Sequence, residues 1–139
     1  MEESIRSAFG LKYKEPRSYS PLTLAYVGDS VYELIIRTYI VEHAARSLKS
    51  MNIEDAALAR AVTQARVASA IEPLLSEEEA EIYRRGRNAS PESRAKHASM
   101  QEYRMATGLE ALTGYLYLSG RTERLTELIK TGWESLEEK

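Results

Sequence analysis

The sequence contains no cysteine, which excludes a disulfide framework and any metal site built on thiolates. No apolar run approaches the roughly 18 residues that a membrane helix needs. The first ten residues, MEESIRSAFG, are acidic where a secretory signal would be apolar. The net charge is −2, so any binding to nucleic acid must depend on a local basic patch or a bound cation. We expect a cytoplasmic protein without membrane association.

Strand signals are also scarce, because the sequence has no sustained alternation of apolar and polar residues and no Asn-Gly or Asp-Gly dipeptide. The few glycines and prolines lie mostly between periodic segments. The composition, 43% hydrophobic and 29% charged, is typical of a folded globular protein. We therefore expect residues 1–139 to form a single all-α domain, with residues 1–19 as a loose lead-in that includes a short helical turn around residues 5–9.

Capping signals divide the rest of the chain into helices. The expected helices are 21 to about 41, capped by Ser20 with Pro21 at its first position; 53 to about 71, capped by Asn52; 77 to about 85, opened by a Ser76–Glu79 capping box and ended by Gly86; 100 to about 119, opened by a Ser99–Glu102 capping box; and a last helix capped by Thr122. Residues 87–98 read as a loop. The first of these helices is apolar on nearly all sides, so we expect neighbouring helices or a second subunit to cover it.

The first candidate functional residue is Asp29, which lies in the apolar run LAYVGDSVYE directly after Gly28. A carboxylate removed from water costs free energy unless it is paired, hydrogen-bonded or bound to a metal. Packing alone does not explain a charge at this position.

The second candidate is Glu110, in the run YRMATGLEALTGYLYL. Gly108 and Gly114 each cost about 1 kcal/mol relative to alanine inside a helix, so they indicate close approach by another helix. Gly28 suggests the same, and a crossing of the two glycine-bearing helices would bring Asp29 and Glu110 together. Oxygen ligands without cysteine favour Mg²⁺ or Mn²⁺. From the residues alone, pairing of each acid with an arginine is an equally good explanation.

The third feature is a basic segment that contains a single acid, Glu92. Its basic residues are Arg84, Arg85, Arg87, Arg94 and Lys96, with Asn88 and Ser90 as further donors. Such a segment suits contact with phosphate groups, although a solvated charge cluster is the more common meaning of this pattern.

GDSVYE after an apolar lead, and ATGLEALTGYLYL about eighty residues later, resemble the two signature helices of the ribonuclease III catalytic domain. The intervening YRRGRNAS, PESRAKHAS and EYR resemble its short subgroup, Mini-ribonuclease III. The similarity spans about residues 20–120. It implies an all-α endonuclease that acts as a homodimer on double-stranded RNA with Mg²⁺, for which Mn²⁺ could substitute. It also implies maturation of large-subunit (23S) ribosomal RNA precursor, with a ribosomal protein as a candidate accessory.

The resemblance also implies roles for individual residues. Asp29 and Glu110 match catalytic metal ligands of the family, whereas two further family acids are replaced by Ala25 and Thr107, as is typical of the short subgroup. Water or RNA phosphate would then complete the metal's coordination. Glu33, one turn after Asp29, is a candidate outer ligand, and a helix-surface ion pair with an arginine four residues later is the alternative.

The sequence thus yields one main hypothesis, a Mg²⁺-dependent endoribonuclease whose metal positions and activates a water for attack on the phosphodiester. We expect no double-stranded-RNA-binding domain to follow the catalytic domain. RNA affinity would then come from a dimer of the catalytic domain and from the basic segment, Arg84 to Lys96. A non-catalytic RNA-binding or ribosome-associated protein of the same fold is the first alternative, supported by Ala25 and Thr107. A helical interaction module without an RNA role is the second.

Overall fold

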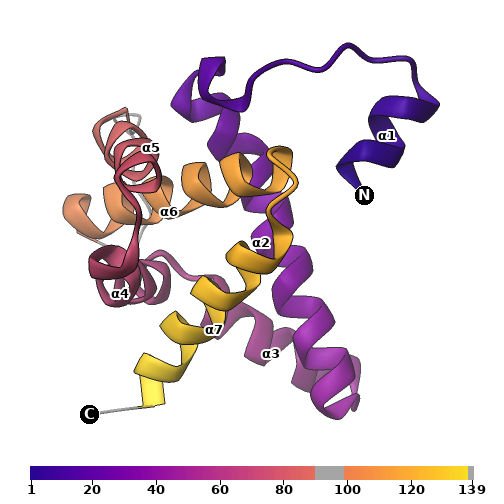
Figure 1. Ribbon diagram of the computed structural model, residues 1–139. Coiled ribbons are helices and arrows are strands. Elements are labelled where there is room, and N and C mark those ends of the chain that lie inside the picture. The colour runs from indigo at the N-terminus through magenta and orange to yellow at the C-terminus, as the bar shows by residue number, and fades with distance from the viewer. Residues whose placement is uncertain (90–98, 138–139) are drawn as a thin grey trace.

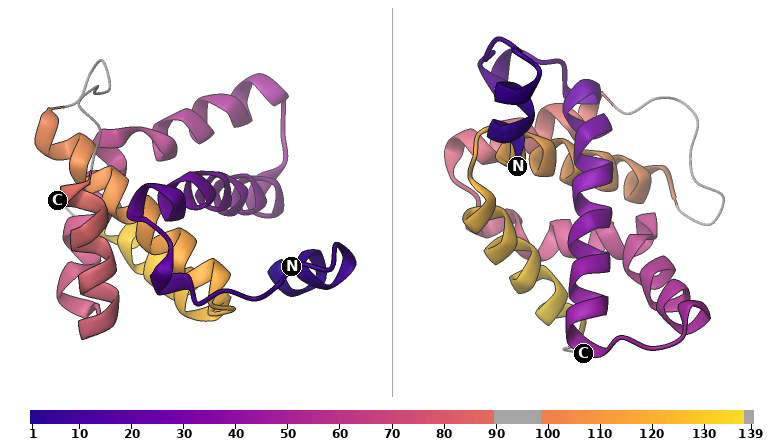
Figure 2. Two further views of the ribbon diagram at one scale, coloured as in Figure 1. Left: turned by 90° about the horizontal axis from the view of Figure 1, so that it is seen from above. Right: turned by 90° about the vertical axis from the view of Figure 1, so that its right-hand side faces the viewer.

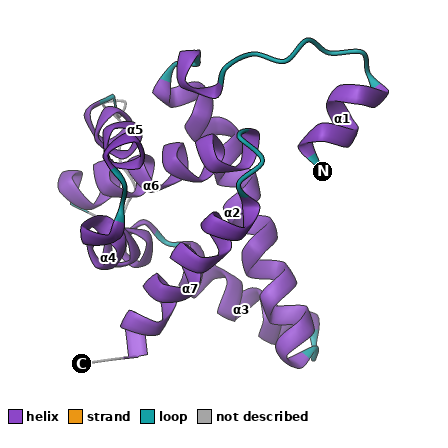
Figure 3. Cartoon of the chain, in the orientation of Figure 1, coloured by secondary structure: helices purple, strands orange, loops and turns teal. Residues whose placement is uncertain are grey.

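The computed structural model describes residues 1–89 and 99–137, and in these residues it contains helices, turns and loops but no strand (Figure 3). The elements are α1 (Glu2–Ala8), η1 (Pro16–Ser18), α2 (Pro21–Ala44), α3 (Leu48–Ala59), α4 (Ala61–Ile71), η2 (Glu72–Leu74), α5 (Glu77–Asn88), α6 (Met100–Leu118) and α7 (Thr122–Glu137). The prediction of an all-α fold is confirmed. None of the described helices combines the length and apolar character needed to cross a membrane.

Helix α6 is the centre around which the other helices pack (Figures 1 and 2). Every residue from Ala106 to Leu116 is buried except Glu110, which is half-buried. Helices α2, α4 and α5 pack on α6, and α7 packs mainly on α4. A single acidic side chain therefore interrupts the most completely buried stretch of the protein.

Helices α2 and α6 cross with their backbones in contact, as the right-hand view of Figure 2 shows. A Cβ atom built on Gly28 would overlap the backbone carbonyl of Glu110, and one built on Gly114 would overlap the carbonyl of Leu24. Only glycine fits at either position. The prediction that the glycines mark a close helix crossing is confirmed for Gly28 and Gly114, whereas Gly108 packs against Tyr83 of the helix at residues 77–88.

The prediction of a single helix over residues 53–71 is wrong. The helix begins earlier, at Leu48, and the segment is divided into α3 and α4. The Ser47 side chain, not Asn52, caps α3, accepting a hydrogen bond of 3.1 Å from the backbone nitrogen of Ser50. The chain is extended at Arg60, with φ −63° and ψ 150°, which separates α3 from α4.

Side chains at the start of α4 stabilise this break. The Thr63 hydroxyl donates to the Ala57 carbonyl at 2.7 Å, and the Gln64 amide donates to the Ala59 carbonyl at 2.9 Å. These carbonyls lie at the end of α3, where the helix itself offers no donor. Donors that follow the break therefore replace the missing helical hydrogen bonds.

Gly86 does not end α5, which continues to Asn88. A Cβ on Gly86 would lie 2.7 Å from the Cβ of Ala111 and 3.0 Å from the Cα of Gly108, so the glycine allows α5 to pack closely on α6. Arg87 and Asn88, predicted to lie in a loop, are consequently helical. Residues 90–98 of that predicted loop lie outside the described residues.

The other boundaries are close to those predicted. Ser20 caps α2, which extends to Ala44, and both predicted capping boxes are present. The lead-in contains more helix than expected, since α1 and η1 occupy much of it. None of the residues of helix α1 is buried, and its Glu2, Ile5 and Arg6 line a surface hollow together with Tyr117 and Leu118 of α6 (Figure 2).

One face of α2 stays uncovered. Its buried stripe consists of Leu24, Ala25, Gly28, Tyr32, Ile36 and Ile40. Elsewhere on the helix Tyr26 is 81% exposed, Leu34 49% and Val41 52%. Neighbouring helices therefore cover one stripe of α2, and cover of the remaining apolar side chains by a second subunit stays a prediction.

We predict that Gly28→Ala destabilises the fold strongly, because the new methyl group would collide with a backbone carbonyl that cannot move independently of α6. Overpacking of this kind costs on the order of 1–3 kcal/mol or more. Urea unfolding of the variant measures the loss. Ser30→Ala, an exposed position two residues later, should change stability by less than about 0.5 kcal/mol. Equal effects of the two substitutions would contradict the proposed role of the crossing.

Candidate active site

Asp29 and Glu110 line the same surface hollow, which has a volume of about 380 Å³. Helix α2 supplies Asp29 and α6 supplies Glu110, and the Gly28 contact with the Glu110 backbone holds these two segments together. The remaining lining residues are Leu22, Ala25, Tyr26, Ala59, Ala61, Gln64, Tyr103, Ala106 and Thr107. The expected convergence of the two acids is therefore present in the structure.

The two carboxylates differ in their environment. Asp29 is exposed, so the expectation that its charge is removed from water is wrong, and Glu110 is the half-buried member of the pair. Burial, followed by the negative charge of Asp29, raises the pKa of Glu110 to about 8. The pair is electrostatically unfavourable when both groups are ionised.

A second buried acid shows what an ordinary structural carboxylate looks like in this protein. Glu79 is fully buried, and Arg124 and Arg121 contact it at 2.8 and 3.4 Å. Hydrogen bonding from Arg124 lowers the pKa of Glu79. Within the described part of the chain, no ion pair joins an arginine or lysine to Asp29 or Glu110. The alternative that an arginine neutralises each acid is therefore not what these residues show.

The positions of the two missing acids also lie in the hollow. Ala25 contributes only a methyl group, and the Thr107 hydroxyl donates to the Tyr103 carbonyl of its own helix at 3.1 Å. Neither residue adds a charged ligand. Among the described residues, no group of three or more His, Cys, Asp or Glu is placed to hold a metal.

Gln64 is a site residue that was not recognised from the sequence. Its side-chain nitrogen lies 3.4 Å from Glu110 Oε2, and the residue is only 4% exposed. The available signal was its spacing, since Gln64 follows Ala61 by three residues and precedes Ala68 by four. It is thus a polar residue on an apolar helical face.

Glu33, the candidate outer ligand, does not line this hollow. Arg37 Nε donates to its carboxylate at 2.8 Å, which is the alternative anticipated for this residue. Burial opposes the Glu33 charge, but hydrogen bonds with Asp55 and Arg37 lower the pKa of Glu33 overall. The hydrogen bond with Glu33 in turn raises the pKa of Asp55 to about 6. Glu33 therefore belongs to a neighbouring α2–α3 cluster.

The basic segment divides into free and engaged side chains. Arg84 and Asn88 are exposed on α5. The Arg85 guanidinium points to the backbone carbonyls of Arg17 and Tyr19, at 3.4 and 3.5 Å. Arg87 has its own partners, since its guanidinium lies 4.0 Å from the Glu72 carboxylate and 5.4 Å from the ring centre of Tyr83. Arg94 and Lys96 lie outside the described residues.

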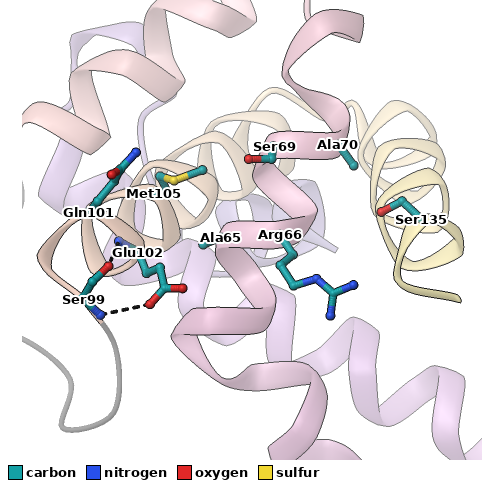
Figure 4. A pocket seen from close by; sticks show the side chains of 9 residues that line it. All are labelled: Ala65, Arg66, Ser69, Ala70, Ser99, Gln101, Glu102, Met105 and Ser135. Carbon is teal, nitrogen blue, oxygen red and sulfur yellow. Dashed lines mark hydrogen bonds between the residues drawn. The ribbon is translucent and has the colours of Figure 1, made fainter. Parts of the chain in front are cut away.

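A larger hollow, of about 600 Å³, lies among α4, the start of α6 and α7 (Figure 4). Its one carboxylate, Glu102, accepts a hydrogen bond from the Ser99 backbone nitrogen in the capping box. Without a second acid it lacks the feature that distinguishes the Asp29–Glu110 site.

The ribonuclease III domain family matches residues 22–121, which is more than half of the chain. The chain belongs to the ribonuclease III family. It is 45% identical over 121 residues to Mini-ribonuclease 3 of Thermoanaerobacter sp. (strain X514), covering 87% of this chain and 85% of that protein. It is 36% identical over 127 residues to Mini-ribonuclease 3 of Symbiobacterium thermophilum, covering 91% and 98%.

A crystal structure of a protein from Fusobacterium nucleatum has the same fold, with a TM-score of 0.80 at 30% identity, covering 88% of this chain and 98% of that one. The predicted resemblance to ribonuclease III is thus confirmed, and the chain is an endoribonuclease of that type. Asp29, Gln64 and Glu110 all lie in the matched region.

We predict that the stability effect of Glu110→Gln depends on pH. Because the folded pKa of Glu110, about 8, exceeds its ordinary value of 4.5, the folded protein binds a proton that the unfolded chain has already lost in this range. Wild-type stability, measured by urea unfolding with chelator present, should therefore fall relative to the variant as pH rises from about 5 to about 9, by on the order of 4 kcal/mol. Glu81→Gln, on exposed α5 surface, should show no such trend. A pH-independent difference for Glu110→Gln would contradict the assignment.

Proposed function

We propose that residues 1–139 form a single ribonuclease III-like catalytic domain that cleaves double-stranded or structured RNA with Mg²⁺, or with Mn²⁺ as a substitute. The observation that carries this proposal is the pair Asp29 and Glu110, two carboxylates that share one hollow without a basic partner in the described residues. Hard oxygen ligands of this kind suit Mg²⁺, which commonly retains several waters. The small ligand set is therefore compatible with the cation.

In this proposal Asp29 and Glu110 hold the cation, which when bound would stabilise charge at the reacting phosphate. Glu110 contributes a half-buried carboxylate whose position the α2–α6 crossing restricts. Asp29 is open to solvent and so to the incoming RNA backbone. Glu33 is engaged by Arg37, so we place it outside the direct ligands and keep it as a candidate for the outer shell.

The proposed RNA-binding surface is the segment from Arg84 to Lys96. Arg84 and Asn88 have exposed side chains that could meet phosphate groups directly, and Arg94 and Lys96 follow in the same segment. Arg85 and Arg87 already have protein partners, so RNA contact would compete with those contacts. Phosphate contacts of this type fix the position of a duplex without reading its sequence.

We further propose a homodimer that covers the exposed apolar side chains of α2, among them Tyr26, Leu34 and Val41. A dimer would double the phosphate contacts and present one site to each strand of a duplex. The resemblance to Mini-ribonuclease III suggests that the RNA is the precursor of large-subunit (23S) ribosomal RNA, with a ribosomal protein as accessory. That substrate would place the reaction in the cytoplasm.

The proposal predicts that Asp29→Asn reduces cleavage of duplex RNA by at least about 100-fold, since even outer-shell partners of metals contribute 10–100-fold. The variant should keep its fold because Asp29 is exposed. Cleavage of labelled duplex RNA in Mg²⁺ and in chelator measures the effect, and circular dichroism verifies folding. Glu81→Gln removes an exposed carboxylate elsewhere and should cut normally. Near wild-type cleavage by Asp29→Asn would refute its role, and no Mg²⁺-dependent cleavage by the wild type would favour a non-catalytic RNA-binding protein.

For the RNA surface we predict that Arg84→Ala weakens binding to duplex RNA and lowers the slope of log affinity against log salt by about 1, as expected for one lost phosphate contact. Binding is measured by fluorescence anisotropy at several salt concentrations, in chelator so that cleavage does not intervene. Lys130→Ala removes one exposed positive charge on α7 and should leave the slope unchanged. If both variants lower the slope equally, the effect reflects net charge and not this surface.

A further inference from the structure

Gln64 is a buried polar side chain that lines the proposed cation site. It begins at the first turn of α4 and reaches the Ala59 carbonyl at 2.9 Å and Glu110 Oε2 at 3.4 Å. The Ala59 carbonyl can only accept a hydrogen bond, and so can the Glu110 carboxylate when it is ionised. The amide nitrogen of Gln64 must therefore face both of them. The orientation of the amide follows from this chemistry.

The other end of the amide, Oε1, has no partner among the described residues and is closed off from solvent. An unsatisfied buried polar atom costs about 1–3 kcal/mol. The protein therefore tolerates this cost while the amide nitrogen stays in contact with Ala59 and Glu110.

The hydrogen bond of Gln64 to the end of α3 does not by itself explain why a glutamine occupies this position. The neighbouring Thr63 performs the same task, donating to Ala57 at 2.7 Å, and its side chain leaves no buried atom without a partner. Gln64 differs because it also contacts Glu110 and because its Oε1 has no partner in the part of the chain that the structure describes.

We propose that Gln64 is a positioning residue of the cation site: its amide nitrogen donates to the Glu110 carboxylate and holds it in the orientation in which it meets a divalent cation shared with Asp29. This inference rests on the proposed function. Because Ala25 and Thr107 supply no carboxylate, binding of the cation depends more strongly on the orientation of Glu110. Gln64 restricts that orientation from a third helix.

The decisive measurement is Mg²⁺ binding to the RNA-free protein by titration calorimetry, which does not depend on catalysis. Gln64→Leu should weaken binding by about 10-fold or more, the range found for outer-shell partners of metals. Thr63→Val is the matched control, because it removes the equivalent α3–α4 hydrogen bond without touching Glu110. It should lower stability and leave Mg²⁺ affinity unchanged.

A second variant covers the case in which Gln64→Leu fails to fold. Gln64→Glu keeps the side-chain length but places a third carboxylate against Glu110. It should lower the melting temperature in chelator and show a larger Mg²⁺-induced rise than the wild type, because a ligand that binds the folded state stabilises it in proportion to its affinity. A purely structural role of Gln64 predicts the same loss of melting temperature with and without Mg²⁺.

The outcomes separate this inference from the proposed function. If the wild type binds Mg²⁺, Asp29→Asn loses it and Gln64→Leu retains wild-type affinity, the role of Gln64 is refuted and the proposed function stands. If Gln64→Leu and Thr63→Val weaken binding equally, Gln64 acts only through the α3–α4 junction, which also refutes the inference. If the wild type itself binds no Mg²⁺, both proposals fail.

Discussion

The contact between the backbones of α2 and α6 is the constraint on which the rest of the structure depends. The carbonyl of Glu110 occupies the volume that a side chain at position 28 would need, and the carbonyl of Leu24 does the same at Gly114. Because the residue after Gly28 is Asp29, this contact brings one acid next to the other. The acidic pair is thus a direct consequence of how two helices pack. The helix crossing also fixes the backbone positions of the two acids relative to each other.

The protein keeps this pair at an energetic cost. Burial and the charge of Asp29 raise the pKa of Glu110 to about 8, whereas the fully buried Glu79 is neutralised by two arginines. The structural acid Glu79 therefore has basic partners. Among the described residues, neither Asp29 nor Glu110 has one. Local rules of stability are commonly violated at functional sites. Gln64 Oε1 is a further departure from these rules, because it is a buried acceptor without a hydrogen-bond partner among the described residues.

These violations explain what could be predicted from the sequence. Gly28, Gly114 and the two acids each conflict with local propensity, so the crossing and the convergence were predictable from the residues themselves. Gly86 was wrongly predicted to end a helix, because glycine occurs both at helix ends and where another helix packs closely. Only the position of α6 shows that the second reason applies here. The engagement of Arg85 depends on partners distant in the chain, which no local pattern encodes. The break at Arg60 has local partners, but no glycine or proline marks it.

Helix α2 also links the proposed site to the proposed dimer. Tyr26, which is 81% exposed, lines the same hollow as Asp29. A second copy that covers Tyr26 would therefore lie next to the proposed site, and two-fold symmetry would bring its own Asp29 to the same region. The exposed apolar face and the exposed acid are then two parts of one arrangement. The spacing of two cuts across a duplex would follow from the geometry of a pair of α2 helices, without a contact to any base.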